Sequence, residues 1–176
     1  SSGTKQWTKQ LGTSAGEYVT GVATTKVNES IYIYVTGITH AGLDSNSHSG
    51  GRDIFLTQYN DEGTKQWTRQ LGGTGDDNPL DVTADSDGNA YTVGYTTGSN
   101  LDGQTKSGST DAFFVKYNSS GTKQWTKLLG FSSPNYRQVT ANGVTTDSIN
   151  NVYVVGYTNL DLVSEESVST SGFLIK

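Results

Sequence analysis

A six-residue block occurs three times in this chain. Gly-Thr-Lys-Gln-Trp-Thr begins at Gly3, Gly63 and Gly121, and a Leu-Gly pair follows each copy. The tryptophans of the three blocks are separated by 60 and 58 positions. Self-similarity at such a period is the sequence signature of a repeat architecture, in which each repeat is one supersecondary unit. The 176 residues are therefore three copies of one unit, at approximately 3–62, 63–120 and 121–176.

Each repeat contains four short segments of strand character, which we call strands A to D. Apolar and polar residues alternate in these segments, and no window has the helical period. Turn residues, such as the Asp-Ser-Asp-Gly-Asn run at 85–89, separate the segments. The expected strands are 22–24, 82–84 and 144–146 for A, 34–39, 91–96 and 153–158 for B, 55–58, 113–116 and 173–176 for C, and 5–8, 65–68 and 123–126 for D.

Four-stranded units of this length predict β-propeller blades, since a helical solenoid would need amphipathic helices that the sequence lacks. The predicted fold is all-β, with three four-stranded antiparallel blades forming a single propeller segment over 1–176. The repeats are in circularly shifted phase, because the first block is a strand D and the last segment is a strand C. Three blades are fewer than the usual minimum of about four, so the segment is expected to be open ended.

The open ends indicate how the last blade obtains its fourth strand. Strand D near the N-terminus, with Lys5 and Trp7, complements strands A to C near the C-terminus, where strand C contains Phe173 and Ile175. The partner is either another copy, joined head to tail, or the remainder of a longer propeller. Two copies would give six blades, and a head-to-tail contact closes into a ring when the rotation permits. The sequence leaves both alternatives open.

The composition excludes several classes of partner. The formal net charge of −5 argues against a nucleic-acid backbone as ligand. The chain has no Cys, which removes disulfides and thiolate metal sites. No apolar run approaches the roughly 18 residues of a membrane span, so no membrane insertion is expected.

The repeated pattern resembles a known family. Asp-Ile-Phe-x-x-x-Tyr-Asn, Gly-Thr-Lys-Gln-Trp, Leu-Gly-Gly and Asp-x-x-Gly-Asn-x-Tyr-x-x-Gly-Tyr-Thr are similar to the bacterial β-propeller repeat called SBBP, most clearly at 53–97. The first repeat departs from the pattern at its A–B turn, 26–30, and the third has an insertion within 131–142 and Ser171 in place of the Asp before strand C. The resemblance implies a secreted or cell-surface bacterial protein with a scaffold or interaction role. It implies no catalytic residues.

Three acidic residues recur at the start of the B–C loops, namely Asp44, Asp102 and Asp161. They could present equivalent polar groups to a repeated ligand, together with Tyr136 in a variable loop. We favour the alternative that each Asp accepts backbone hydrogen bonds and fixes the start of a long loop.

Other sites have weaker support. His40 and His48, with Asp44 and Asp53 near them in sequence, could form a divalent-metal cluster, but the other B–C loops contain no His. The turn at 85–89 resembles the start of a calcium loop but lacks the bidentate Glu that such a loop needs, so we predict a hairpin turn. No metal and no cofactor are expected.

The predicted function is therefore a non-enzymatic structural or interaction module at the bacterial cell surface or outside the cell. The alternative is a carbohydrate-binding propeller that stacks sugars on exposed aromatic residues such as Tyr18, Phe131 and Tyr136. Trp7, Trp67 and Trp125 are poorer candidates for stacking, because an aromatic residue at one repeated strand position usually packs between blades. No nucleophile–base–acid set is visible, so an enzyme is not expected.

Overall fold

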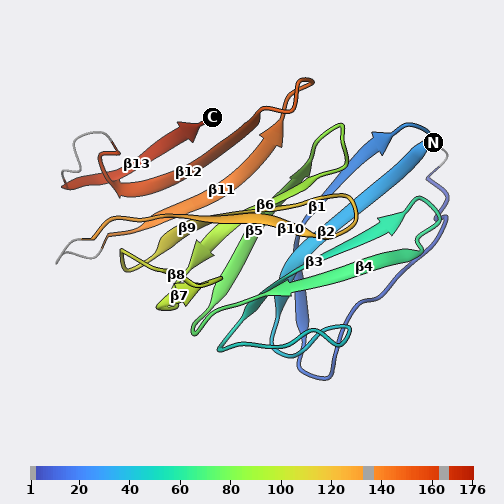
Figure 1. Cartoon of the computed structure of the whole chain (residues 1–176), viewed down its shortest axis with the longest axis horizontal. Coiled ribbons are helices and arrows are strands. Elements are labelled where there is room, and N and C mark those ends of the chain that lie inside the picture. Colours follow the sequence, from blue (N-terminus) through green and yellow to red (C-terminus); the bar gives the residue numbers. More distant parts are fainter. Residues whose placement is uncertain (1–2, 133–136, 163–166) are drawn as a thin grey trace.

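The computed structural model describes residues 3–132, 137–162 and 167–176. Within these residues every regular element is a strand, and the strands form three antiparallel sheets that fan out side by side (Figure 1). The first blade comprises β1 (Glu17–Val27), β2 (Ser30–Thr39), β3 (Asp53–Asn60) and β4 (Lys65–Leu71). The second comprises β5 (Asp77–Ala84), β6 (Ala90–Thr96), β9 (Asp111–Tyr117) and β10 (Lys123–Leu129), and the third comprises β11 (Val139–Thr146), β12 (Val152–Leu160) and β13 (Ser167–Ile175).

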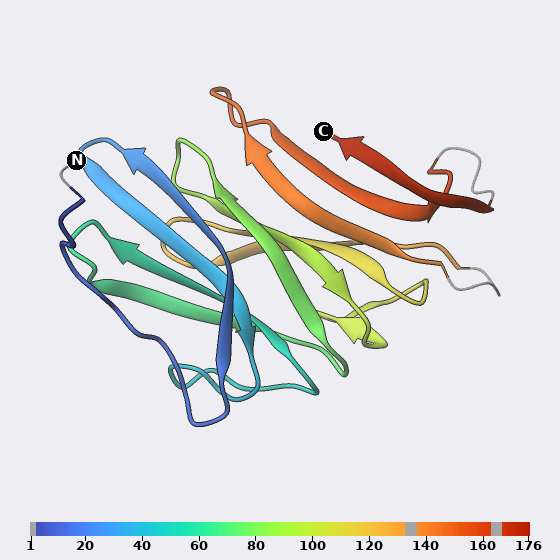
Figure 2. The same ribbon diagram turned by 180° about the vertical axis from the view of Figure 1, so that it is seen from behind.

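This arrangement confirms the predicted all-β fold of consecutive blades. The strands follow the order A, B, C, D across each of the first two sheets, and β5 contacts both β1 and β11, so the second blade lies between the others (Figure 2). The sheets do not close into a ring. A short hairpin of β7 (Asn100–Leu101) and β8 (Gln104–Thr105), which the sequence pattern did not predict, lies in the second B–C loop.

The glycine of the Tyr-x-x-Gly segment is needed where strand B passes strand A. A Cβ on Gly94 would occupy the position of the Asn78 carbonyl oxygen, and Gly37 meets the carbonyl of Tyr18 in the same way. Each strand A has a β-bulge directly after this close approach, between Pro79 and Asp81 in the second blade. A bulge bends the strand and raises its twist, which is how a flat sheet becomes a propeller blade.

The core lies between the blades. One cluster joins Tyr34 and Leu56 of the first blade to Val82 and Val115 of the second. Another cluster joins residues of the second blade, such as Val93, to residues of the third. Each blade is therefore stabilised by apolar burial against its neighbour, as expected for a repeat that cannot bury its own faces.

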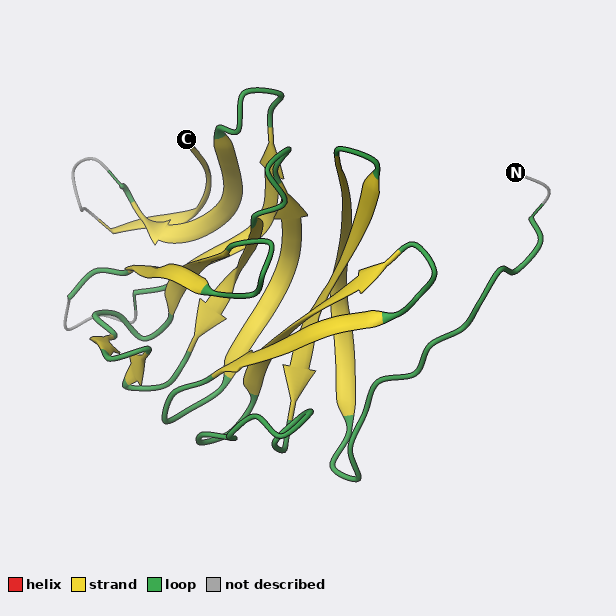
Figure 3. Cartoon of the chain, turned by 45° about the vertical axis from the view of Figure 1, so that its right-hand side comes forward, coloured by secondary structure: helices red, strands yellow, loops and turns green. Residues whose placement is uncertain are grey.

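The prediction of a strand at 5–8 is wrong for the single chain. Residues 3–12 run as an extended segment that pairs with no strand, and Figure 3 shows this segment passing outside the sheets. The physical reason is that β4 already completes the first blade, so no edge within the chain is in a position to pair with the segment. The third sheet has three strands among the described residues, because no strand D pairs with β13.

Candidate interaction surfaces at the two ends of the blade array

The interface between the first two blades shows what a completed blade contact looks like. Val82 on strand A of the second blade is 3 % exposed and packs against Tyr34 and Leu56. The Tyr34 hydroxyl donates to the Gly88 carbonyl at 2.5 Å, and the Thr36 and Thr92 hydroxyls lie 3.2 Å apart. This contact combines an apolar centre with satisfied buried polar groups.

One end of the array exposes the strand-A half of this interface. The side of the first blade that faces away from the second, here called the leading face, contains Val19 and Val22 on β1, with Ile33 and Val35 on β2. Val22 is 64 % exposed and Val19 is 62 % exposed. Three valines thus occupy one position of strand A, and the valines of the second and third repeats, Val82 and Val144, are only 3 % and 9 % exposed.

The other end exposes the complementary half. The side of the third blade that faces away from the second, here called the trailing face, contains Val155 and Tyr157 on β12 and Leu174 on β13. Val155 is 48 % exposed and Leu174 is 69 % exposed. The residues that correspond to these two in earlier repeats, Val93 and Leu56, are each 1 % exposed. The two ends of the chain therefore present the two halves of a contact that is buried inside it.

A second repeated contact joins strand D of one blade to the C–D turn of the next. The indole N–H of Trp67 donates to the Ser119 carbonyl at 3.1 Å, and the ring lies against Gly121, where a Cβ would be 2.7 Å from Cδ2. Arg69 Nε donates to the Gly121 carbonyl at 2.6 Å. Gly121 has φ +77° and leaves room for the indole, which explains why glycine opens this Gly-Thr-Lys-Gln-Trp-Thr block.

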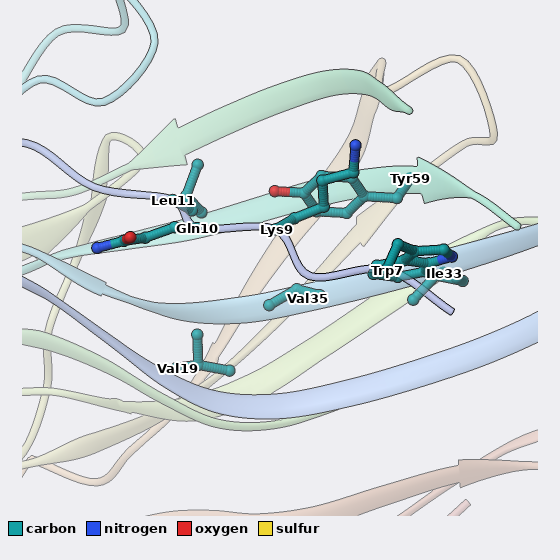
Figure 4. A pocket seen from close by; sticks show the side chains of 8 residues that line it. All are labelled: Trp7, Lys9, Gln10, Leu11, Val19, Ile33, Val35 and Tyr59. Atoms are coloured by element: carbon teal, nitrogen blue, oxygen red, sulfur yellow. The ribbon is translucent and has the colours of Figure 1, made fainter. Parts of the chain in front are cut away.

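Residues 3–12 make this same contact with the first blade. The Trp7 indole N–H donates to the Asp61 carbonyl at 2.9 Å, and a Cβ on Gly63 would be 2.9 Å from Trp7 Cδ2. Asp61 and Gly63 precede Ser119 and Gly121 by 58 positions. Figure 4 shows Trp7 lying over Ile33 of the leading face. The segment therefore lies where strand D of a preceding blade would lie.

Trp125 lacks the hydrogen bond that Trp67 donates to the C–D turn of the next blade. It is 38 % exposed, its ring lies 6.2 Å from that of Tyr91, and its indole N–H has no acceptor among the described residues. Beside it an apolar groove of about 410 Å³ runs between the second and third blades, lined by Phe114, Leu129, Val154 and other residues. In the preceding interface Tyr117, which is 4 % exposed, closes the corresponding space.

Two of the repeated loop aspartates bind lysines of strand D. Asp44 accepts from Lys65 Nζ and from the Thr68 hydroxyl, both at 2.5 Å, and Asp102 pairs with Lys123. Although burial raises the pKa of Asp44, the hydrogen bonds from Lys65 and Thr68 outweigh it and leave the pKa below its usual value. These carboxylates fix the loop to strand D through side chains, and not through backbone N–H groups as we had expected. Ligand binding by Asp44, Asp102 and Asp161 stays a prediction.

The residues predicted to complete the last blade lie at the two ends of the blade array. Lys5 and Trp7 lie on the extended segment, and Phe173 and Ile175 lie on β13 with their side chains facing the second blade. Tyr136 lies outside the described residues, so the carbohydrate-binding alternative stays a prediction. Sequence reasoning missed the exposed valines, although their equivalence to Val82 and Val144 could have been seen from the repeat alignment.

The A–B turns of the second and third blades are closed by their own carboxylates. Asp85 accepts from the backbone N–H groups of Asp87 and Asn89, from the Asn89 side chain and from the Tyr91 hydroxyl. Asp147 makes the equivalent bonds in the third blade, and these, led by the Asn151 side chain, lower its pKa to about 2. The oxygens that a calcium ion would need are thus engaged in hydrogen bonds, as in a hairpin turn.

Two buried carboxylates support the loops between the first and second blades. Asp53 accepts from Ser49 N at 2.9 Å and Gln70 Nε2 at 2.7 Å, and Asp77 accepts from Gly73 N at 2.7 Å. Burial raises the pKa of Asp77 to about 6, and the nearby carboxylate of Asp53 adds to this effect. One oxygen of each carboxylate has no hydrogen-bond partner in the structure.

The histidines and carboxylates do not gather into a metal site in the described residues. In residues 3–132, 137–162 and 167–176 no group of three or more His, Asp or Glu is arranged to hold a metal ion. His48 Nδ1 lies 3.4 Å from Asp53 Oδ2, whereas His40 Nδ1 lies 3.2 Å from the Gly16 carbonyl. The two histidines therefore have different partners. No helix among these residues has the length and apolar character of a membrane span.

Parts of the chain are similar to known sequences. A family model described as a beta-propeller repeat, SBBP, matches residues 66–102 and 124–162. Each match runs from strand D of one blade into strand B of the next and on into the B–C loop. An uncharacterized WD repeat-containing protein of Acanthamoeba polyphaga mimivirus is 26 % identical over 132 residues, which covers 66 % of this chain and 9 % of that relative. This chain thus spans less than a tenth of the length of the relative.

The repeat matches and the architecture agree. Each matched segment spans a blade boundary, because it runs from strand D of one sheet into strand A of the next. The first two sheets have the four antiparallel strands of propeller blades, and all three sheets pack side by side as blades do. Residues 66–102 and 124–162 therefore match the β-propeller repeat described as SBBP.

Proposed function

We propose that this chain is a non-enzymatic interaction module that binds a second copy of itself head to tail, leading face against trailing face. The observation that carries the proposal is the exposure of one repeated valine. Val22 is 64 % exposed on the leading face, whereas Val82 and Val144 are 3 % and 9 % exposed inside the array. Exposed apolar faces of this kind mark interaction sites.

The chemistry of the two faces supports a second copy as the occupant. Inside the chain, a strand-A face like the leading face always contacts a face like the trailing one, with Val82 against Leu56 as an example. A second copy presents the same trailing face to the leading face, so the known packing of the interior can be repeated between chains. A heterologous contact of this kind forms rings or open filaments, depending on the rotation per copy. Placement at the bacterial cell surface stays a prediction of the sequence.

The test is the mass of the protein in solution over a range of concentrations, measured by analytical ultracentrifugation. We expect the unmodified chain to form dimers or larger closed species. Val22→Asp and Val155→Asp should each weaken association by at least about tenfold, since burying an unpaired charge costs more than about 1.4 kcal/mol. Thr105→Asp is the control, because Thr105 is exposed on β8 of the second blade, which lies between the other two blades.

Two results would contradict the proposal. One is a folded monomer at every concentration up to the millimolar range. The other is an oligomer that Val22→Asp and Thr105→Asp affect equally, because such an oligomer would not use the leading face.

A further inference from the structure

The third sheet has an edge that the other two sheets do not have. In the second blade, β9 pairs with β6 on one side and with β10 on the other. In the third blade, β13 pairs with β12, and its other edge has no strand partner among the described residues. A free edge presents a row of backbone N–H and C=O groups and is a template for another strand.

The extended segment 3–12 is already positioned as a strand D. At its start, Trp7 makes the contact with the Asp61 carbonyl that Trp67 makes with Ser119. At its end, Thr13 N donates to a carboxylate oxygen of Glu17 at 2.6 Å, as Gly73 N donates to Asp77 at 2.7 Å. The segment is therefore fixed at Trp7 and Thr13 in the way that β4 is fixed at Trp67 and Gly73, although it has no strand partner among the described residues.

We propose that residues 3–12 of one copy add to the free edge of β13 in a second copy, as the fourth antiparallel strand of its third blade. The inference rests on the proposed function, because it specifies how the leading and trailing faces of two copies meet. The segment needs little rearrangement, so binding loses less conformational entropy than the ordering of a free tail would. The third blade is then completed by residues from another chain.

The internal blades fix the register of this pairing. In the first blade Thr57 lies opposite Thr68, with their hydroxyls 3.1 Å apart. In the second blade Val115 lies opposite Thr126. The residues at these positions in β13 and in the segment are Ile175 and Thr8, which are therefore expected to lie opposite each other across the two chains.

Disulfide trapping tests this register directly. The chain contains no Cys, so every disulfide reports an introduced pair. Two single variants, Thr8→Cys and Ile175→Cys, are mixed under mild oxidation and separated on a non-reducing gel. Directly opposed residues of antiparallel strands have Cβ atoms about 4.5–5.5 Å apart, within reach of a disulfide after a small adjustment. We expect a linked dimer that reductant dissolves, and much less linkage in either variant alone.

A shifted pair is the control. Leu174→Cys with Thr8→Cys moves one cysteine by a single residue, which places the two side chains on opposite faces of the sheet. Linkage of this pair should be at least about tenfold slower than linkage of the matched pair, because a disulfide needs both Cβ atoms on the same side. Ile175→Cys also removes apolar volume next to the second blade, so circular dichroism of each variant is compared with that of the unmodified chain.

The outcomes separate the two proposals. If the unmodified chain associates and only the matched pair links, the strand exchange is supported. If the chain associates but the matched pair links no faster than the shifted pair, the register proposal is overturned while self-association stands. If the folded chain stays monomeric and neither pair links, both proposals are overturned.

Discussion

The blade interfaces inside the chain and the two faces at its ends are built from the same residues but differ in what covers them. Between the first and second blades, Val82 and Leu56 are almost fully buried. On the end faces their counterparts Val22 and Leu174 are mostly exposed. Because the repeat itself is unchanged, exposure depends on the neighbour and not on the residue. The difference teaches that an apolar position in a repeat is a core residue only where the next repeat is present.

The largest expected effect comes from replacing the repeated valine of strand A by aspartate, once inside the array at Val82 and once on the leading face at Val22. Val82→Asp should lower the free energy of unfolding by about 3–5 kcal/mol, the cost of an uncompensated buried charge. Val22→Asp should change the unfolding of the monomer by less than about 0.5 kcal/mol, because Val22 is 64 % exposed. Urea denaturation of both variants, followed at a protein concentration where the chain is monomeric, measures the difference. Equal losses in the two variants would show that the leading face is already covered in the monomer.

The next prediction compares the pH dependence of stability due to Asp77 and to Glu17, two carboxylates that occupy the same position in the second and first repeats. Asp77 in the interior has its pKa raised to about 6, mainly by burial, from about 3.8 in an unfolded chain. The folded state thus favours the protonated form, and stability should fall as pH rises from about 4 through 6, by up to about 3 kcal/mol. Asp77→Asn stays neutral, so the advantage of this variant over the original chain should grow over the same range.

Glu17 at the leading face should behave in the opposite sense. Although burial raises the pKa of Glu17, hydrogen bonds from Thr13 and Thr39 outweigh it and lower the pKa below 4.5. Its contribution is therefore present above that pH and is lost as the pH falls through the folded-state pKa. Urea unfolding of the original chain, Asp77→Asn and Glu17→Gln at pH 4 and 7 measures how each carboxylate changes the free energy of unfolding with pH, and the two changes should have opposite signs. A free-energy difference for Asp77→Asn that is the same at both pH values would contradict the raised pKa.

The repeated Leu-Gly pair gives a smaller contrast. A Cβ on Gly72 would overlap the carboxylate of Asp53, which is buried and held by Ser49 and Gln70. Gly72→Ala should therefore cost about 1–3 kcal/mol, as overpacking does. A Cβ on Gly12 would lie 3.0 Å from the end of the Glu17 side chain, which can move, so Gly12→Ala should cost less than about 0.5 kcal/mol. Thermal unfolding of the two variants measures the contrast, and equal shifts in Tm would show that Asp53 is not fixed.

Much of the fold could be predicted from the repeat, because strands, turns and blade order follow from local pattern and spacing. The strand at 5–8 was predicted wrongly, since its sequence is that of strand D but its partner edge is absent from the chain. Strand propensity cannot supply the backbone groups that a strand must pair with. The small hairpin at Asn100–Leu101 and Gln104–Thr105 was missed because two-residue strands have no detectable period.

The surfaces were only partly predictable. The open ends were expected from the phase of the repeats, and the structure places Lys5 and Trp7 on one side of the array and Phe173 and Ile175 on the other. The Lys partners of the loop aspartates were not predicted. They are 21 positions away in sequence, and only the pairing of β3 with β4 brings them next to the loop.

The tryptophans of strand D allow a finer test of the comparison. Trp67→Phe removes the hydrogen bond to the Ser119 carbonyl and should lower the free energy of unfolding by about 1 kcal/mol. Trp125→Phe removes an N–H that has no acceptor among the described residues, so the unfolding of the monomer should change by less than about 0.5 kcal/mol. If a second copy supplies the missing backbone carbonyl, the same change should weaken association about fivefold. Sedimentation combined with urea unfolding separates the two effects, and a change in neither would exclude a role for the Trp125 indole.

The smallest effect expected concerns an ion pair between copies. Inside the chain, a loop aspartate binds the lysine of strand D, as in the pairs of Asp44 with Lys65 and Asp102 with Lys123. The third aspartate, Asp161, would meet Lys5 of the second copy once residues 3–12 complete the third blade. An exposed pair contributes about 0.2–1 kcal/mol, so Lys5→Asp should weaken association at most about fivefold.

A charge exchange distinguishes this pair from a general charge effect. Lys5→Asp and Asp161→Lys change the net charge of the acidic chain in opposite directions, by −2 and +2. If only net charge mattered, one variant would associate more weakly than the original chain and the other more strongly. If the residues pair, both single variants associate more weakly, and the chain that carries both changes regains most of the loss. Sedimentation at about 50 mM salt, where screening is weak, is the condition that shows the pairing best.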